Sequence, residues 1–230
     1  MATNFNSPYY PYEKSYPGYL TGRGSELIPD KLIRYLLDLP DAKGYVPVDD
    51  NERPRVRLMK YLWHDGEKPL EQPLPSEEEK LSLLYRGEKP VLNTDEAQKA
   101  HPKGYRLFPQ AFWVPADFRA GSLLKCYMGR NLPYSPLQWE IGITFELVVN
   151  YQQDNNLRTS ALSRLAAMEQ ALIEALHGVN ITGVGGVNFN RVVHMDDGSH
   201  YFHDEGENIG RQVNFSITWK ESGAKGAVVE

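Results

Sequence analysis

The hydrophobic and polar positions between residues 141 and 220 predict strands on both sides of one helix. In the run 141–150 every odd position is apolar, and Gly142, Thr144, Glu146 and Asn150 hold even positions. A period of two is typical of a strand with one buried face. The runs 187–193 and 211–220 repeat this apolar alternation. The expected core positions are Ile141, Ile143, Phe145, Leu147, Val149, Val187, Phe189, Val193, Val213, Phe215, Ile217 and Trp219. The expected outward positions are Thr144, Glu146, Asn188, Asn190, Asn214, Ser216 and Thr218.

The segment from about 157 to 177 has a helical period instead. Asn155 or Asn156 can cap its start, and Gly178 can end it. A helix of this length on one face of an antiparallel sheet gives an α+β layer architecture. Its apolar stripe consists of Leu162, Leu165, Met168, Leu172, Ala175 and Leu176.

Two strand-like runs precede this unit, GYRLFPQAFWVP at 104–115 and SLLKCYMG at 122–129. Turn-rich breaks at 116–121 and 129–136 separate the three runs, which predicts an antiparallel meander. Residues 105–220 are therefore expected to form an α+β core domain, an antiparallel sheet with one long amphipathic helix packed on one face.

Residues 1–28 are expected to form an extended arm, because prolines recur there too densely for a helix or a central strand. Tyrosine concentrates at protein interfaces because it combines a large apolar ring with a polar end. We expect the arm to dock on a neighbouring subunit, and the alternative is a tail that stays free or folds back. The expected contact residues are Tyr9, Tyr10, Tyr12, Tyr16 and Tyr19.

Residues 29–104 are expected to be a Pro-rich, helical and loop-rich insertion, and 221–230 a C-terminal tail. A short helix starts at Pro29 and ends before Pro40. The run 55–66 is compatible with a helix or a strand.

A second helix in this insertion starts after Ser76, which forms a capping-box pattern with Glu79, and Gly87 suits its end. A further short helix is expected over 94–101. Because the insertion has little apolar mass, we expect a contact surface rather than a separate domain.

Composition narrows the function classes. The 230 residues carry a formal net charge of −5, which disfavours binding to nucleic acid or to an anionic membrane. The single cysteine, Cys126, is expected to be a small half-buried hydrophobe in a protein that folds in a reducing cytoplasm. The start of the chain lacks the features of a signal peptide, and no run has the roughly 20 apolar residues of a membrane helix. We expect a soluble protein.

The densest group of reactive side chains lies at 194–208, where His200 and His203 stand among several carboxylates. Such a group can hold zinc or iron, so a small metal-dependent enzyme that uses residues 194–205 is one hypothesis. The position between two strand runs instead favours a turn. The glycines of 183–189 precede a strand rather than a helix, so they are expected to form a turn and not a phosphate loop. Glu140 and Glu146 are expected to be exposed strand residues. We therefore expect no catalytic, cofactor-binding or metal-binding residues.

Four arginines of the core domain can form salt bridges across a subunit interface, and unpaired surface arginines are the alternative. They are Arg158, Arg164, Arg191 and Arg211.

The order of ITFELVVNY, the helix RTSALSRLAAMEQALIEALHG, ITGVGGVNFNRV, a loop and IGRQVNFSITWK resembles the tail-terminator and neck proteins of tailed bacteriophages. The run GYRLFPQAFW before SLLKCYMG is similar to the earlier strands of that fold. The resemblance covers residues 105–220. It implies a sheet packed on a helix, a ring that is often hexameric, and a place between the tail tube and the head connector, with no catalytic residues.

We therefore expect a virion structural protein that forms a ring at the head–tail neck or the tail end, made in the host cytoplasm. Its expected partners are copies of itself, in a hexameric ring, and the neighbouring tail tube, sheath or head-connector proteins. Genome DNA is expected to pass through the lumen without specific binding. A baseplate or other tail-associated adaptor is the alternative within the same class.

Overall fold

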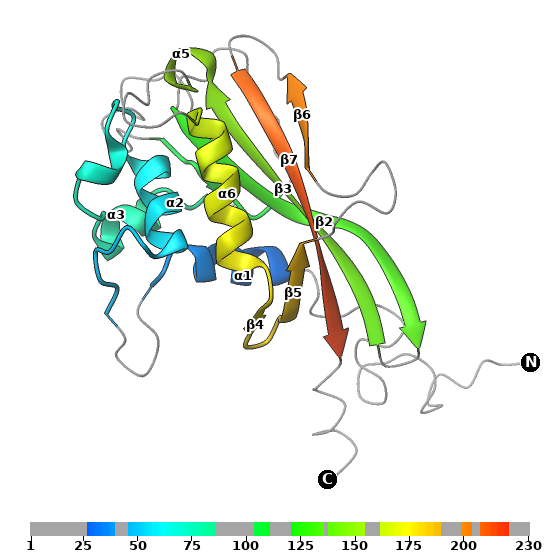
Figure 1. Ribbon diagram of the computed structural model, residues 1–230. Coiled ribbons are helices and arrows are strands. Elements are labelled where there is room, and N and C mark those ends of the chain that lie inside the picture. Colours follow the sequence, from blue (N-terminus) through cyan, green and yellow to red (C-terminus); the bar gives the residue numbers. More distant parts are fainter. Residues whose placement is uncertain are drawn as a thin grey trace, which may run out of the picture.

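The structure is a computed structural model in which one layer of helices packs on one face of a mixed sheet (Figure 1). This arrangement confirms the predicted α+β class. The residues that the structure describes are 27–39, 46–85, 104–110, 121–135, 138–154, 162–189, 199–203 and 208–220.

The sheet has seven strands in the order β1-β2-β3-β7-β5-β4, and β6 pairs with β7 beside this path. The pairs are antiparallel except for β1 with β2, which is parallel. The strands are β1 (Leu107–Phe108), β2 (Ser122–Ser135), β3 (Gln138–Asn150), β4 (Val179–Ile181), β5 (Gly185–Phe189), β6 (Ser199–His203) and β7 (Asn208–Lys220).

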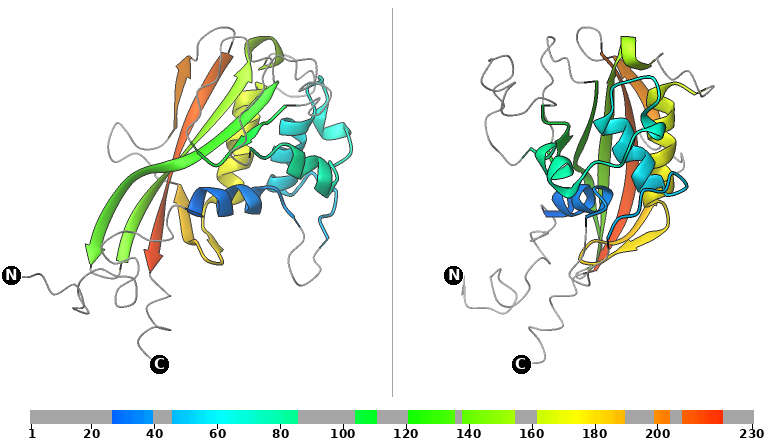
Figure 2. Two further views of the ribbon diagram at one scale, coloured as in Figure 1. Left: turned by 180° about the vertical axis from the view of Figure 1, so that it is seen from behind. Right: turned by 90° about the vertical axis from the view of Figure 1, so that its left-hand side faces the viewer.

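Helices α1, α2 and α6 lie on the same side of the sheet (Figures 1 and 2). Among the described helices, none combines the length and the apolar character that crossing a lipid bilayer requires. The helices are α1 (Ile28–Leu36), α2 (Pro54–Trp63), the 3-10 helix η2 (Pro69–Glu71), α3 (Glu77–Ser82), α5 (Tyr151–Asp154) and α6 (Arg164–Leu176).

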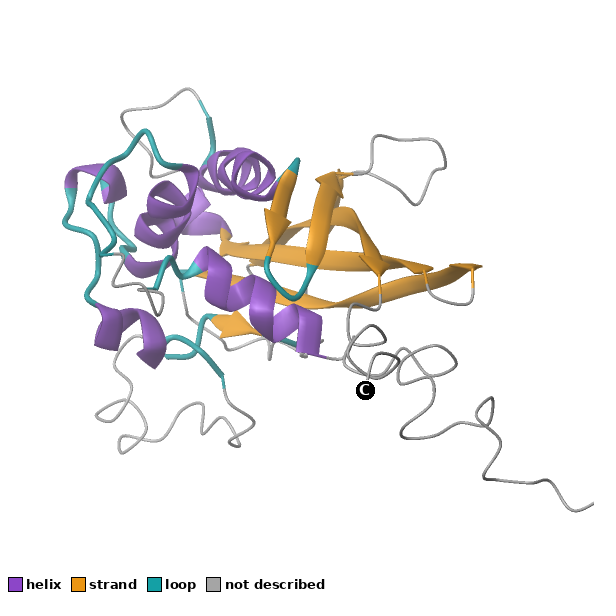
Figure 3. Ribbon diagram, turned by 90° about the horizontal axis from the view of Figure 1, so that it is seen from below, coloured by secondary structure: helices purple, strands orange, loops and turns teal. Residues whose placement is uncertain are grey.

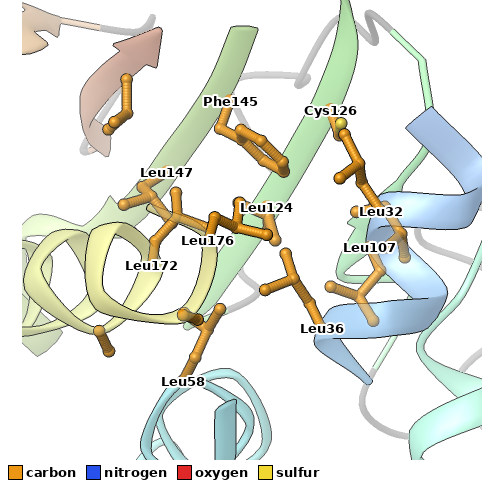
Figure 4. Packing of buried hydrophobic residues seen from close by; sticks show 14 of the residues in the cluster. Leu32, Leu36, Leu58, Leu107, Leu124, Cys126, Phe145, Leu147, Leu172 and Leu176 are labelled. Atoms are coloured by element: carbon orange, nitrogen blue, oxygen red, sulfur yellow. The ribbon is translucent and has the colours of Figure 1, made fainter. Parts of the chain in front are cut away.

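The predicted alternation of β3 is confirmed over 141–149, where every odd position is buried. Phe145 and Leu147 are fully buried, and Phe145 pairs with Val213 of β7 on one side and Cys126 of β2 on the other. Leucines of α1, α2 and α6 close the core from the opposite side (Figure 4). The strands and helices therefore share one hydrophobic core.

Two predicted helix boundaries are confirmed. Ser76 and Glu79 form the capping box that starts α3, and Gly178, with φ of 76°, follows the end of α6. The left-handed conformation at Gly178 favours glycine because a Cβ is strained there. The ambiguous run 55–66 is mostly helix α2, which begins at Pro54.

The predicted start of the long helix is wrong. Helix α6 begins at Arg164, and Leu162 and Ser163 are not helical. The Ser163 hydroxyl accepts a hydrogen bond from Ala166 N, and Asp154 accepts one from Leu165 N at 2.7 Å. These oxygens satisfy amide groups that the first helical turn leaves free, so the helix starts here. Leu162 accordingly lies off the buried stripe and is 45% exposed.

The predicted antiparallel meander is wrong for its first pair, because β1 runs parallel to β2. The predicted break at 129–136 is also wrong, since β2 continues to Ser135. A register shift between Met128 and Asn131 places three residue steps of β2 opposite two of β3. Such a bulge absorbs Gly129 without ending the strand.

Two further boundaries differ from the prediction. Helix α3 ends at Ser82 and not near Gly87, because Leu83 and Leu84 turn into the core and Leu84 bridges to Leu107 of β1. Within the predicted turn at 194–208, residues 199–203 form β6, which pairs with β7. The expected helix at 94–101 lies outside the described residues.

Candidate interaction surface

The face of the sheet opposite the described helices carries hydrogen-bonding side chains in three cross-strand rows. Even positions of β3, β5 and β7 and the odd positions of β2 up to Tyr127, before the bulge, share this face, because side chains alternate along a strand. We call it the open face. Its rows are Lys125–Glu146–Gln212, Tyr127–Thr144–Asn214 and Gly142–Ser216–Asn188, followed by Thr218.

The charges of the first row neutralise one another. Lys125 Nζ lies 2.9 Å from Glu146 Oε2, and the Tyr127 hydroxyl donates to Glu146 Oε1 at 2.5 Å. Burial of the phenol raises the pKa of Tyr127, and the hydrogen bond to Glu146 and the charge of that carboxylate raise it further. Tyr127 is therefore held as a proton donor, and both oxygens of Glu146 are engaged. The group is suited to fixing neighbouring strands rather than to accepting a proton from a substrate.

The second row is linked by a hydrogen bond from Thr144 Oγ1 to Asn214 Oδ1 at 2.9 Å. The outward phase predicted for Thr144, Glu146, Asn188, Asn214, Ser216 and Thr218 is confirmed, but Thr144 is only 6% exposed. Tall neighbours in its row, Tyr127 and Asn214, explain part of this burial. Asn188 in the third row and Thr218 in the row after it are exposed, so this part of the open face is accessible.

The outer edge of β2 is less suited to contact than this face. Leu124 N donates to Arg106 O of the segment before β1, so alternate amide groups of β2 point to this edge. Beyond that contact the strand contains the bulge after Met128 and then Pro133, which has no N–H. Bulges and prolines protect a sheet edge against pairing with another chain.

Two buried arginines cap the end of α2. Arg164 donates to Tyr61 O at 3.0 Å, to His64 O at 2.8 Å and to Gly66 O at 2.5 Å. Arg106 donates to Leu62 O and forms a two-pronged pair with Asp65 at 2.6 and 2.7 Å. Guanidinium groups suit this position because the last carbonyls of a helix are unsatisfied and partly negative.

The expectation that Arg164 reaches a subunit interface is wrong, since its side chain is fully buried. Burial lowers the pKa of Arg164, and nearby Asp65 and Tyr61 oppose that shift. Position 164 holds one signal that could have indicated this role. A cation in the first turn of a helix opposes the helix dipole, so an arginine there needs another partner.

A second buried charge ties α1 to α2. Asp38 has φ of 50° and is 1% exposed, and its carboxylate lies 2.8 Å from Arg55 Nη2 and 3.7 Å from Arg53 Nη1. Burial lowers the pKa of neighbouring Lys80, while the charge of Asp38 raises it. Aspartate tolerates the left-handed conformation that ends α1 and supplies the negative charge that these cations require.

Besides Arg164, the structure describes one of the predicted subunit-contact residues, Arg211. It lies on β7, and its Nη1 is 2.9 Å from Glu169 Oε2 of α6, so this pair joins the sheet to the helix of the same chain. Tyr9, Tyr10, Tyr12, Tyr16, Tyr19, Arg158 and Arg191 lie outside the described residues.

The proposed metal loop is only partly described. Over the described ranges, no group of three His, Cys, Asp or Glu side chains could hold a metal ion. In β6, His200 is in register with Gln212 and His203 with Ile209. The other histidine and carboxylates of 194–205 lie outside the described residues.

Comparison with known proteins gives no assignment: the chain matches no protein-family model and none of the curated proteins. The functional interpretation therefore rests on the chain's own residues and geometry.

Proposed function

We propose that the chain is a structural subunit that assembles with copies of itself into a closed ring at the head–tail neck or the tail end of a tailed bacteriophage. The resemblance of residues 105–220 to tail-terminator and neck proteins is the reason for this class. In this proposal α6 is the long amphipathic helix of the terminator-like domain. The arm 1–28 and the insertion 29–104 reach neighbouring subunits or the adjoining tail tube, sheath or head-connector ring.

The observation that carries the proposal is the one-sided packing of the sheet. Helices α1, α2 and α6 lie on one face of the sheet (Figure 2). The opposite face presents exposed Asn188 in its third row and exposed Thr218 in the row after it. Ser216 and Gly142, which share the row of Asn188, are small, so Asn188 and Thr218 are the accessible hydrogen-bonding groups there. Interfaces between separately folded subunits are about as polar as the rest of a protein surface, so a polar face is compatible with such a contact.

The net charge of the chain also fits a ring around DNA. Lys125 and Glu146 form an internal pair on the open face, and the whole chain has a formal net charge of −5. A neutral or acidic lumen lets phosphate groups pass because it offers no cluster of cations to hold them.

In this proposal the two sides of each ring contact come from different parts of the subunit. We expect the open face of one subunit to meet the helices or loops of the next, because contacts between unlike patches close into rings when the rotation permits. A hexamer is the expected ring.

Substitution of an exposed open-face residue tests this contact. Thr218→Arg places a long charged side chain beside the third row and should dissociate the ring into smaller species, as measured by native mass spectrometry. Thr218→Ser keeps the hydroxyl and should leave the ring intact. A Thr218→Arg protein that assembles as the unsubstituted chain does would remove the open face from the contact.

A further inference from the structure

A second apolar cluster lies on the open face, at the end of the sheet where β2 begins and β3 ends. Leu123 pairs with Val148, and both have the open-face phase of their strands. Phe108 of β1 pairs with Lys125, so its ring lies on the same face. Leu123 and Phe108 are each 1% exposed and Val148 is 2% exposed, yet none of the three belongs to the core that the helices close. We call Phe108, Leu123 and Val148 the apolar patch.

The burial of the apolar patch is greater than its described neighbours explain. Val148 lies between Leu123 and Gly210 of β7, and a glycine has no side chain to shelter it. Tyr85 borders the patch at the β1 edge, where its ring centroid lies 5.6 Å from that of Phe108. Helices α1, α2 and α6 lie on the other face (Figure 2). A side chain on a sheet face keeps its tip exposed until a second layer packs on it, so a further part of the chain must cover the patch.

The connection between β1 and β2 has to cross one face of the sheet. The two strands are parallel neighbours, and Leu107 is level with Leu124, although β2 already begins at Ser122. A chain that joins parallel neighbours cannot turn back within the plane of the sheet, so it passes over a face. On the core face, Leu32 and Leu36 of α1 already pack beside Leu124 (Figure 4). The route that remains is the open face, where the apolar patch lies.

The composition of the connecting segment fits this position. Residues 111–120, AFWVPADFRA, contain three aromatic side chains. The other segment that ends beside the patch, 86–103, is rich in charged residues and contains no phenylalanine, tyrosine or tryptophan. Ten extended residues span up to about 33 Å, which is enough to pass over β2 and reach β3 before the chain returns to Gly121.

The polar neighbours of the patch are suited to a covered site. Lys125 is buried on the open face, and its Nζ lies 2.9 Å from Glu146 Oε2. Burial is also the largest cause of the raised pKa of Tyr127, which donates to the same carboxylate. A charge that loses contact with water requires a partner, and here each charge has one. This part of the open face can therefore lie beneath an apolar layer.

We propose that segment 111–120 packs Phe112, Trp113 and Phe118 on the apolar patch of its own chain. The segment then forms a second layer on one end of the open face. The inference concerns a single copy, so it does not rest on the assembly in the proposed function.

This layer confines the surface that is left for another subunit. The strand ends near Gln138 and Lys220 project beyond the helices (Figure 3), and they lie at the opposite end of the strands from the apolar patch. Exposed Thr218 belongs to that projecting end, and Asn188 lies one row before it. A contact between subunits through the open face is therefore limited to this end of the sheet.

Photo-cross-linking in the full chain tests the inference. Trp113 is replaced by a photo-cross-linking phenylalanine analogue, and equal amounts of ¹⁴N- and ¹⁵N-labelled protein are assembled together and irradiated. We expect mass spectrometry to find cross-links to the peptides that contain Leu123 or Val148, formed within one isotopic form. Cross-links to the helices, cross-links that join the two isotopic forms, or an absence of cross-links to the patch would each overturn the inference.

Two variants of different surfaces sharpen the test. Leu123→Ala with Val148→Ala should lower the cross-link yield about tenfold, because the substitutions remove the apolar atoms on which the segment packs. Leu162→Ala truncates an exposed side chain outside the patch and should leave the yield unchanged. Equal yields in the double variant and the original patch, with both proteins folded by circular dichroism, would contradict the contact.

The cross-links of the original patch decide the inference even where the double variant does not fold. A chain that stays monomeric and still cross-links Trp113 to the patch supports this inference and overturns the proposed function. A ring whose Trp113 does not reach the patch gives the reverse result.

Discussion

Arg106 and Arg164 bind the same end of α2, although 58 positions, the difference between their numbers, separate them in the chain. Arg106 comes from the segment that leads into β1, and Arg164 is the first residue of α6. Their shared target fixes α2 between the sheet edge and the helix that lies over the sheet. The helical layer thus keeps the position that leaves the opposite face open.

Arg164→Met should destabilise the fold by about 3 kcal/mol, because the carbonyls of Tyr61, His64 and Gly66 lose their donors in a buried site. Urea unfolding at neutral pH measures the change. Arg34→Met removes an exposed pair with Asp30 and should cost less than about 0.5 kcal/mol. Equal costs for the two substitutions would contradict the capping role.

Asp38→Asn should also destabilise the fold, by about 1–3 kcal/mol, because Arg55 and Arg53 lose the buried charge that balances them. Asparagine still tolerates the left-handed backbone, so the cost reports charge and not strain. The same unfolding experiment measures it.

The loss of folding stability caused by Asp38→Asn should become smaller at alkaline pH. Burial lowers the pKa of Lys80 below its ordinary 10.5, so in the window between the folded value and 10.5 the unfolded chain binds more protons and stability rises with pH. Loss of Asp38 removes a charge that raises the pKa of Lys80. The rise of stability with pH is therefore larger in the Asp38→Asn variant than in the original chain. A deficit that stays constant from pH 7 to 10 would contradict the coupling.

Tyr127→Phe should change how stability depends on alkaline pH. The pKa of Tyr127 is raised in the folded state, so the stability it contributes is present below about pH 10, the unfolded value, and is lost as pH rises through the folded value. The variant should lose about 1–2 kcal/mol at pH 7, where the bond to Glu146 is missing, and should decline less than the original chain above pH 10. Parallel declines of the two proteins in denaturant titrations would refute this.

Gly185→Ala and Gly186→Ala should differ although the positions are adjacent. Gly185 has φ of 112°, and a Cβ there would lie 2.9 Å from Thr218 O, whereas a Cβ on Gly186 meets nothing within 4 Å. We expect about 2–3 kcal/mol of destabilisation for the first and within about 0.5 kcal/mol for the second. Thermal unfolding compares them, and a tolerated Gly185→Ala would show that β5 does not approach β7 as described.

Local patterns predicted the parts of the fold that local physics decides. The period of two in β3 and the capping box at Ser76 depend on residues close in sequence, so both are visible before the chain folds. The parallel pairing of β1 depends on where Leu84 and Leu107 meet, which no nearby residue encodes. The sequence does not single out the start of α6, because Ser163, Asn155 and Asn156 are all suitable caps. The second acceptor at this start, Asp154, binds Leu165 N from outside the helix.

The candidate surfaces were visible only in part. The outward phase of the open face follows from alternation alone, but the Lys125–Glu146–Tyr127 group requires the register of β2 with β3. The pairing of Asn131 with Ile141 also comes from register, because a bulge shifts β2 by one residue after Met128. A shift of this kind changes which residues are neighbours without leaving a mark in the hydrophobic pattern.

The molar mass of the full chain in solution tests the central claim most directly. Light scattering coupled to size-exclusion chromatography, at several protein concentrations, gives this mass without assumptions about shape. A ring subunit is expected to elute as one closed species, with a mass that is a fixed multiple of 26.2 kDa and about sixfold for the hexamer. A species of 26.2 kDa at every concentration would contradict assembly into a ring.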